Sequence, residues 1–240
     1  MHLKSNRVFA GFLFAFLAFG LLSALDPSMA RAENRTGVGV SFGGVGSPFG
    51  EAVKGAPDTR HRRHFVFGSQ FYHLIATGLG GDNSHLGGRL AFAHLTNDIR
   101  IGGNKVMTLA QFPITLMLAY TKEFGQYSFG LHAGGGININ SVAKSDLLFD
   151  LQLENAPLLI TIDSDLAPVF EAGLIMEYAL SKKTRVVLES NGYFGTISTS
   201  WKFTGSSVPS GLQYIDSDIY VRHITLMLGI NIDLGSSSEG

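Results

Sequence analysis

The chain has 240 residues and a formal net charge of −1, with no cysteine, 30 glycines, 18 phenylalanines and only 15% charged residues. Glycine and aromatic residues at this abundance favour turns and strands, so the composition argues against a disordered chain and against a helical bundle. The absence of cysteine excludes disulfides, and the near-neutral charge gives no basic field for binding nucleic acid.

The N-terminus has the layout of a secretory signal peptide. Two basic residues among the first seven precede an apolar run over residues 8–25, and the small-residue site Ala30-Arg31-Ala32 follows. We expect residues 1–32 to be removed during export, which leaves a mature chain with a net charge of about −3. A retained membrane anchor is the alternative, because the apolar run is long for a signal peptide.

The stretch over residues 219–234 has the clearest periodicity in the chain. From Ile224 to Leu234 every second residue is a bulky aliphatic, and apart from Met227 the residues between them are small or polar. Successive side chains of a strand point to opposite faces, so this segment has one apolar and one polar face. A membrane barrel shows the apolar face to lipid, whereas a soluble barrel or sandwich buries it in its core.

The same alternation recurs along the chain and predicts an all-β protein with eight strands. No stretch after residue 25 is apolar enough for a membrane helix, so a membrane-embedded mature chain must form a closed barrel. In chain order, we expect strands over residues 36–43, 65–78, 85–96, 106–121, 126–140, 165–180, 184–194 and 219–234.

The connections between these strands alternate in length. Short turns are expected at 80–83, 122–125 and 181–183, and longer connections at 44–63, 97–105, 141–164 and 195–216. Within 141–164, two apolar runs are expected to continue the neighbouring strands as a hairpin beyond the bilayer. Short turns at one end and long loops at the other are typical of periplasmic and extracellular connections. We therefore predict an eight-stranded, antiparallel, up-and-down transmembrane β-barrel over residues 33–234, with a tail at 235–240; a count of ten strands stays open.

Two features concern the outer wall of the predicted barrel. The second strand is apolar on both faces, so alternation alone does not distinguish its two sides; we expect Phe65, Phe67, Phe71 and Ile75 to face outward. Aromatic residues form two groups near the two ends of the strands, as expected for interfacial girdles. The group beside the short turns is Tyr120, Phe124, Tyr127 and Tyr178, and the group at the opposite rim is Tyr193, Phe194, Tyr214 and Tyr220.

Eight charged or titratable residues fall on the predicted inward faces. Side chains nearly fill an eight-stranded barrel, so these groups must pair with one another or with trapped water. We interpret them as a structural network of salt bridges, with a narrow proton or ion path as the alternative. The residues are Arg89, His132, Glu171, Glu177, Arg185, Glu189, His223 and Asp233.

Three segments resemble the small outer-membrane β-barrel superfamily of Gram-negative bacteria, which includes the OmpA membrane domain and the OmpX and OmpW types. They read FPITLMLAYTKEFGQYSFGLHAGGGIN, FEAGLIMEYALSKKTRVVLESNGYFG and GINIDL. Gly229, Ile232 and Leu234 fit the spacing of the family's assembly signal, although the terminal Phe is absent and residues 235–240 follow. The resemblance implies a monomer in the outer membrane, surrounded by lipid and lipopolysaccharide and assembled by the barrel-assembly machinery.

Enzymatic chemistry has one weak candidate. Some barrels of this architecture are lipid A deacylases with a histidine, a serine and an acidic residue on the outer wall. Here His223 and Thr225 are two residues apart and Glu189 lies on the preceding strand, but the nucleophile is a threonine and all three are predicted to face inward. We therefore expect a non-enzymatic envelope or surface-interaction protein, with a lipid A-modifying enzyme or a narrow pore for small solutes as alternatives.

The remaining motifs predict no cofactor and no metal site. The glycine-rich stretches at 43–47 and 134–136 precede no helix, so they do not indicate a phosphate-binding loop. His61 and His64 have no acidic or cysteine partner at metal-ligand spacing. In the same loop, Arg60, Arg62 and Arg63 are candidate contacts for lipopolysaccharide phosphates, because guanidinium groups bind phosphate in a bidentate manner.

Overall fold

The structure is a computed structural model, and it describes residues 34–47, 51–55, 59–62, 64–77, 79–101, 104–144, 159–164, 166–204 and 214–234. The predicted signal peptide at residues 1–32 and the predicted tail at 235–240 lie outside the described residues. Within the described ranges, no helix is long and apolar enough to cross a membrane.

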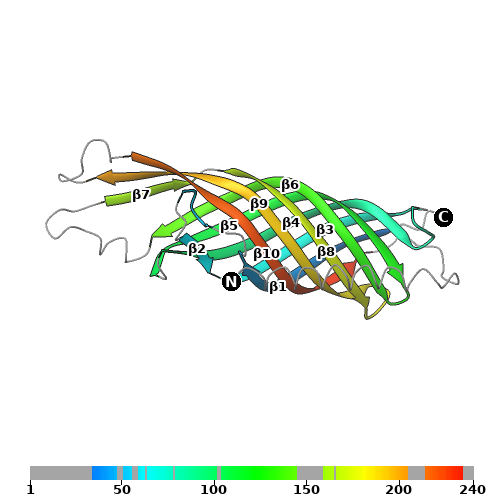
Figure 1. The fold of residues 1–240 in the computed structure, drawn as a ribbon. Coiled ribbons are helices and arrows are strands. Elements are labelled where there is room, and N and C mark those ends of the chain that lie inside the picture. The colour runs from blue at the N-terminus through cyan, green and yellow to red at the C-terminus, as the bar shows by residue number, and fades with distance from the viewer. Residues whose placement is uncertain are drawn as a thin grey trace, which may run out of the picture.

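Ten antiparallel strands make up the described part of the chain, and eight of them close into a ring (Figure 1). The ring order is β10-β1-β3-β4-β5-β6-β8-β9, and β9 pairs with β10 to close it. The predicted eight-stranded antiparallel barrel is therefore confirmed. The ring strands are β1 (Arg35–Gly46), β3 (His64–Thr77), β4 (Ser84–Ile101), β5 (Asn104–Phe124), β6 (Tyr127–Lys144), β8 (Ala167–Ala179), β9 (Thr184–Thr204) and β10 (Tyr214–Asp233). The short strands β2 (Thr59–Arg62) and β7 (Leu159–Ser164) lie beside the ring.

Short turns join the strands at one end of the barrel, which we call the turn end. The turns lie at residues 79–83, 125–126 and 180–183, and the described ends of β1 and β10 lie at the same end. Gly125 has a φ of 64°, a left-handed conformation that favours glycine, so the chain reverses at residues 125–126 and not over 122–125 as predicted. The turns are tied together by backbone hydrogen bonds, such as Glu123 N–H to the Asn83 carbonyl at 2.9 Å.

At the opposite end, which we call the loop end, the strands run further than the sequence predicts. Asn97 to Ile101 continue β4 rather than forming a loop, β9 continues to Thr204, and β10 begins at Tyr214. In these extensions the outward residues are polar, as at Ser198, Ser200 and Asp216, so they lack the apolar outward face that marks a lipid-facing strand. The backbone pairing of the strands nevertheless continues through these extensions. In Figure 1, β7, β9 and β10 project beyond the rest of the barrel.

Two predicted loops also contain strands. Within 44–63, β1 continues to Gly46, Val53 forms a bridge with Ile219, and β2 pairs with Asp98–Ile101 of β4. Within 141–164, β6 continues to Lys144, but β7 pairs with β9 and prolongs β8 along that strand. The second apolar run therefore continues the line of the neighbouring strand, as expected, whereas the first run lies outside the described residues, so the hairpin between the two stays a prediction. The pairing partner of β7 is 35 to 45 residues away in the sequence, which local pattern does not reveal.

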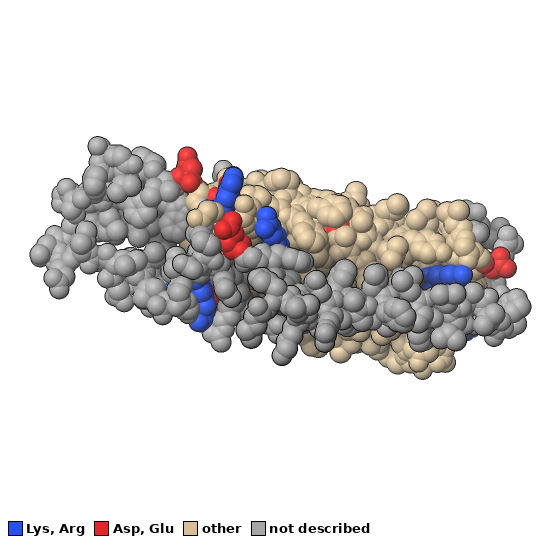
Figure 2. Space-filling model, in the orientation of Figure 1, with Lys and Arg blue, Asp and Glu red and all other residues tan. Residues whose placement is uncertain are grey.

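The outward face of the barrel wall is apolar over most of its length. The outward set predicted for the second strand is confirmed, because Phe65, Phe67, Phe71 and Ile75 are all exposed. The aliphatic face of β10 is likewise exposed, whereas the residues between face inward. Figure 2 shows that described charged residues on this side gather toward the two ends of the molecule.

The aromatic group at the turn end lies as predicted, but the group at the loop end needs one correction. Tyr127 and Tyr178 pack against each other on the outward face, with ring centroids 5.0 Å apart. Tyr193, in contrast, is only 1% exposed and points inward, and its neighbour Phe194 faces outward. Adjacent strand residues point to opposite faces, so both cannot belong to an outer girdle. The side chain of Tyr214 lies outside what the structure describes.

The interior is divided along the barrel axis into a polar and an apolar region. Near the turn end and the middle, charged and amide side chains fill the space. Toward the loop end they give way to a buried apolar cluster, which we call the apolar layer; its central members include Leu95, Ile99, Leu109, Ile197 and Ile219.

Candidate functional site

The charged interior residues begin with a cluster at the turn end, held by two arginines. Arg35 Nη1 lies 2.9 Å from Glu177 Oε2, and Arg35 Nε lies 3.4 Å from Asp233 Oδ1. Arg185 bridges Glu123 at 2.8 Å and Asp233 at 3.4 Å. Because each guanidinium contacts two carboxylates, the strands β1, β5, β8, β9 and β10 are cross-linked at this end.

Neutral hydrogen-bond donors complete the shells of these carboxylates. Ser128 Oγ donates to Glu177 Oε2, and Asn231 Nδ2 donates to Glu177 Oε1, both at 2.7 Å. The Tyr72 hydroxyl donates to Asp233 Oδ1 at 2.7 Å. Buried charges are stable only when paired and hydrogen-bonded, and Glu177 and Asp233 satisfy both conditions, whereas Arg35 Nε and Nη2 are buried without a hydrogen-bond partner among the described residues.

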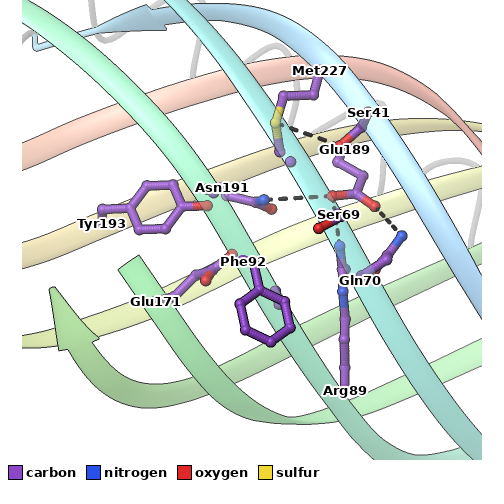
Figure 3. A pocket seen from close by; sticks show the side chains of 13 residues that line it. Ser41, Ser69, Gln70, Arg89, Phe92, Glu171, Glu189, Asn191, Tyr193 and Met227 are labelled. Carbon is purple, nitrogen blue, oxygen red and sulfur yellow. Dashed lines mark hydrogen bonds and ion pairs between the residues drawn. The ribbon is translucent and has the colours of Figure 1, made fainter. Parts of the chain in front are cut away.

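Gln70 links the turn-end cluster to a second cluster in the middle of the barrel. Its Nε2 amide donates to Asn231 Oδ1 at 2.8 Å and to Glu189 Oε1 at 2.9 Å. Since Asn231 in turn donates to Glu177, one chain of hydrogen bonds runs from the turn end to the barrel middle. Figure 3 shows Gln70, Arg89 and Asn191 converging on Glu189.

Arg89 holds the middle cluster together. Its Nη2 lies 2.6 Å from Glu189 Oε2, and its Nη1 lies 3.1 Å from His132 Nδ1. A guanidinium can only donate, so Nδ1 of His132 is the acceptor in this contact. On the far side of the ring, His132 Nε2 lies 3.8 Å from Glu171 Oε1, and Thr115 donates to the other oxygen of Glu171.

Space inside the middle cluster is small. The cavity beside Glu171, Glu189 and Tyr193 has a volume of about 10 Å³, which is room for about one water molecule. Gly173 is required here, because a Cβ at this position would lie 2.6 Å from His132 Nε2. The cluster is therefore packed to the limit that side chains allow.

His223 belongs to a third and smaller polar group, nearer the loop end. It is fully buried, and its Nε2 lies 2.8 Å from Gln111 Oε1. Asn97 Nδ2 donates to the same Gln111 oxygen at 3.2 Å. This group lies next to the apolar layer, where Tyr193 and Met227 also pack.

All eight sequence-predicted interior residues therefore lie inside the barrel, but not in one site. Glu177, Arg185 and Asp233 meet in the turn-end cluster; Arg89, His132, Glu171 and Glu189 meet in the middle cluster; His223 lies in the third group, with Gln111. Sequence reasoning did not include the polar partners of these residues in the site. Some of them, such as Gln70, Gln111 and Asn231, have the inward parity of their strands and could have been found from it. Arg35 and Glu123 lie at strand ends that were placed outside the predicted strands.

The deacylase-like trio is not assembled. The described partner of His223 is Gln111, Thr225 Oγ1 donates to the Asn191 carbonyl at 3.4 Å, and Glu189 is bonded to Arg89 and Gln70. All three side chains face the interior, away from the outer wall. Within the described residues, no group of three or more His, Cys, Asp and Glu side chains is placed to hold a metal ion.

The loop end carries an open cleft of about 660 Å³ between the β9–β10 extension and the segment at residues 51–55. Ser198 and Ser200 donate to Asp218 at 3.1 Å and Asp216 at 2.8 Å, and Lys54 Nζ lies 3.1 Å from Asp218. The residues that line the cleft are all polar: Lys54, Ser198, Thr199, Ser200, Asp216, Ser217 and Asp218.

The three arginines proposed to contact lipopolysaccharide do not share a loop. Arg60 and Arg62 lie in β2, paired with β4, and Arg63 lies outside the described residues. The loop prediction for this segment is therefore wrong at Arg60 and Arg62, because β4 runs long enough to offer a pairing edge.

Comparison with solved structures places this architecture among known barrels. The outer membrane protein OprG from Pseudomonas aeruginosa aligns with 88% of this chain and 100% of its own, with 15% identity and a TM-score of 0.59. The outer membrane protein AlkL, solved in lipid bilayers, covers 89% of this chain and 98% of its own at 16% identity and a TM-score of 0.46. No protein-family model and no curated protein sequence matches. The chain therefore has the fold of a small eight-stranded outer-membrane β-barrel.

Proposed function

We propose that the mature chain lies in the outer membrane as a closed, non-enzymatic barrel that acts through its surface and does not conduct ions. The observation that carries this proposal is the filled interior. Two salt-bridged clusters occupy the inner part of the barrel, and the cavity beside the middle cluster has a volume of only about 10 Å³. A water-filled ion path needs far more space than a single water molecule occupies.

The apolar layer provides a second barrier. Ile99, Leu109, Ile197 and Ile219 are each 0% exposed, so this level of the interior is dry as well as narrow. Ala52, from the segment at residues 51–55, is also 0% exposed and packs into the same layer. Hydrophobic constrictions of this kind block ions because they exclude the water that hydrates them.

Surface action is supported by the loop end. The β9–β10 extension stands beyond the main barrel, and its outward residues are polar, as Ser198 and Asp216 illustrate. The open polar cleft beside it has a volume of about 660 Å³. If the short turns face the periplasm, as is usual for such barrels, this extension and cleft face the medium.

The proposal is tested by two assays on the folded, purified protein. In planar bilayers we expect no single-channel conductance steps, while a large porin measured in parallel gives them. With purified lipid A we expect no release of acyl chains by wild type. Stable conductance steps would contradict the closed interior, and acyl release that disappears in His223→Ala would contradict the non-enzymatic assignment.

Passage of small apolar solutes is the second candidate function, and the apolar layer is the observation that favours it. An outward wall in lipid explains the exposed aliphatic residues, but it does not require apolar side chains inside the barrel. Side chains such as Leu109 and Ile197 suit an apolar solute better than an ion. Binding of an apolar fluorescent probe to the folded barrel, weakened by Ile197→Asn but unaffected by Lys182→Gln, would favour this candidate over a purely structural interior.

A further inference from the structure

The segment at residues 51–55, which we call the strap, follows β1 along the edge of β10. The pairing of β1 with β10 ends at Gly46 and Ile224. Five positions further toward the loop end of β10, Ile219 forms an isolated bridge with Val53 of the strap. The strap therefore completes this side of the barrel wall at a level beyond the described pairing of β1.

The strap is held to β10 by a short set of contacts. Lys54 N–H donates to the Asp218 carbonyl, and Tyr220 N–H donates to the Ala52 carbonyl, both at 2.9 Å. Lys54 Nζ also lies 3.1 Å from Asp218 Oδ2, with the two side chains 63% and 29% exposed. Exposed ion pairs contribute little to stability, and β9 in contrast pairs with β10 at nineteen positions. The strap is therefore much more weakly paired with β10 than β9 is.

The strap packs against the apolar layer. Ala52 is 0% exposed and belongs to this layer, and Val53 packs against it. The bridge partner of Val53, Ile219, is also 0% exposed. The open polar cleft of about 660 Å³ has Lys54 in its lining, so open space adjoins the strap. Release of the strap would therefore expose apolar side chains at the loop end without breaking any pairing between ring strands.

We propose that the strap is a gate for small apolar solutes and that it opens by unpairing from β10. The inference rests on the second candidate function, passage of such solutes through the apolar layer. Segments that admit ligands come from the parts of a fold that open locally at low cost, and the strap is such a part. A solute that packs against Ile219 in place of the strap binds only the open state, so it shifts the equilibrium toward opening. A polar solute would lose its hydrogen bonds to water there.

Hydrogen exchange measures the opening without any solute. The amides of Lys54 and Tyr220 donate the hydrogen bonds between the strap and β10. The amides of Ile219 and Val221 point toward β9, because successive amides of a strand face opposite neighbours. In the folded barrel in detergent micelles, we expect the first two amides to exchange at least about tenfold faster than the other two. Equal exchange of all four would overturn the proposal, because the strap would then open only together with the barrel.

A disulfide lock tests whether this exchange comes from unpairing of the strap. Lys54→Cys/Asp218→Cys joins the strap to β10 at opposite positions, which lie within disulfide reach in an antiparallel pair. The control, Ser200→Cys/Asp216→Cys, joins β10 to β9 in the same way. The chain has no other cysteine, so each variant forms a single disulfide. Oxidation should slow exchange at Tyr220 at least about tenfold in the lock and leave it unchanged in the control. Equal exchange in oxidised and reduced lock would contradict the gate.

Binding of the apolar fluorescent probe then connects the gate to the solute. Every variant is first checked for folding by heat-dependent gel mobility; if the lock fails to fold, exchange in wild type decides the proposal. We expect the probe to associate at least about tenfold more slowly with the oxidised lock than with the reduced lock, and equally with both forms of the control. Equal association with both forms of the lock would overturn the gate but leave the second candidate function intact. Absence of probe binding in every form would overturn that function and the role of the strap in it, whereas opening of the strap is decided by exchange alone.

Discussion

Removal of the Arg89 charge should be one of the most damaging single changes inside the barrel. The side chains of Arg89 and Glu189 are 4% and 1% exposed, and their closest N–O distance is 2.6 Å. In Arg89→Met, Glu189 loses its ion pair and Glu171 loses the nearest guanidinium. Breaking a buried pair by removing one partner costs about 3–5 kcal/mol, so we expect a loss of about 4 kcal/mol, or about a thousandfold in the folding equilibrium.

The matched variants are Glu189→Gln and the double change Arg89→Met/Glu189→Gln. A glutamine at 189 keeps an acceptor for Gln70 but removes the charge. The double variant therefore leaves no unpaired carboxylate at this position. We expect the double variant to recover at least half of the loss seen in Arg89→Met, because the uncompensated charge is the larger part of the cost. Unfolding by urea in lipid vesicles, followed by heat-dependent gel mobility, gives all three values.

Two results would refute this reasoning. If Arg89→Met cost less than about 1 kcal/mol, the pair would behave like an exposed salt bridge and the interior would be hydrated. If the double variant were less stable than Arg89→Met, Arg89 and Glu189 would not be energetically coupled in the way that their ion pair requires.

Three other predictions concern the wall, the packing and the orientation of the barrel. Leu228→Arg, on the lipid-facing side of β10, should reduce the free energy of unfolding in vesicles by about 2–4 kcal/mol, and a negligible change would place that side away from lipid. Gly173→Ala should reduce the free energy of unfolding by about 1–3 kcal/mol, because its Cβ would press on interior side chains. In the same urea assay, Gly88→Ala should change that free energy by no more than about 0.5 kcal/mol, because its Cβ meets nothing within 4 Å. Because the chain has no cysteine, Lys54→Cys should react with an impermeant maleimide on intact cells and Lys182→Cys only after lysis; the reverse pattern would invert the topology.

The sequence by itself determined the existence and type of the strands that cross the membrane. Alternation of apolar and small residues is a local property, and between Leu226 and Asp233 it already separates the outward from the inward face. It also placed Arg89 and Glu171 inside, because inward parity within a predicted strand needs no knowledge of the neighbouring strand, but it did not place Arg35 and Glu123, which lie at strand ends. The alternation of short and long connections determined which end holds the turns.

Only the tertiary structure decided how far the strands extend and which side chains meet. Outside the lipid-facing band, the outward faces of β9 and β10 are polar, so the apolar outward face by which the strands were predicted ends there, while backbone pairing extends them to Thr204 and Tyr214. Contacts such as Arg35 to Glu177 join residues 142 positions apart in the sequence. Their geometry follows from the register in which β1 pairs with β10 to close the barrel. Likewise, Arg60 and Arg100 become backbone neighbours only through the pairing of β2 with β4.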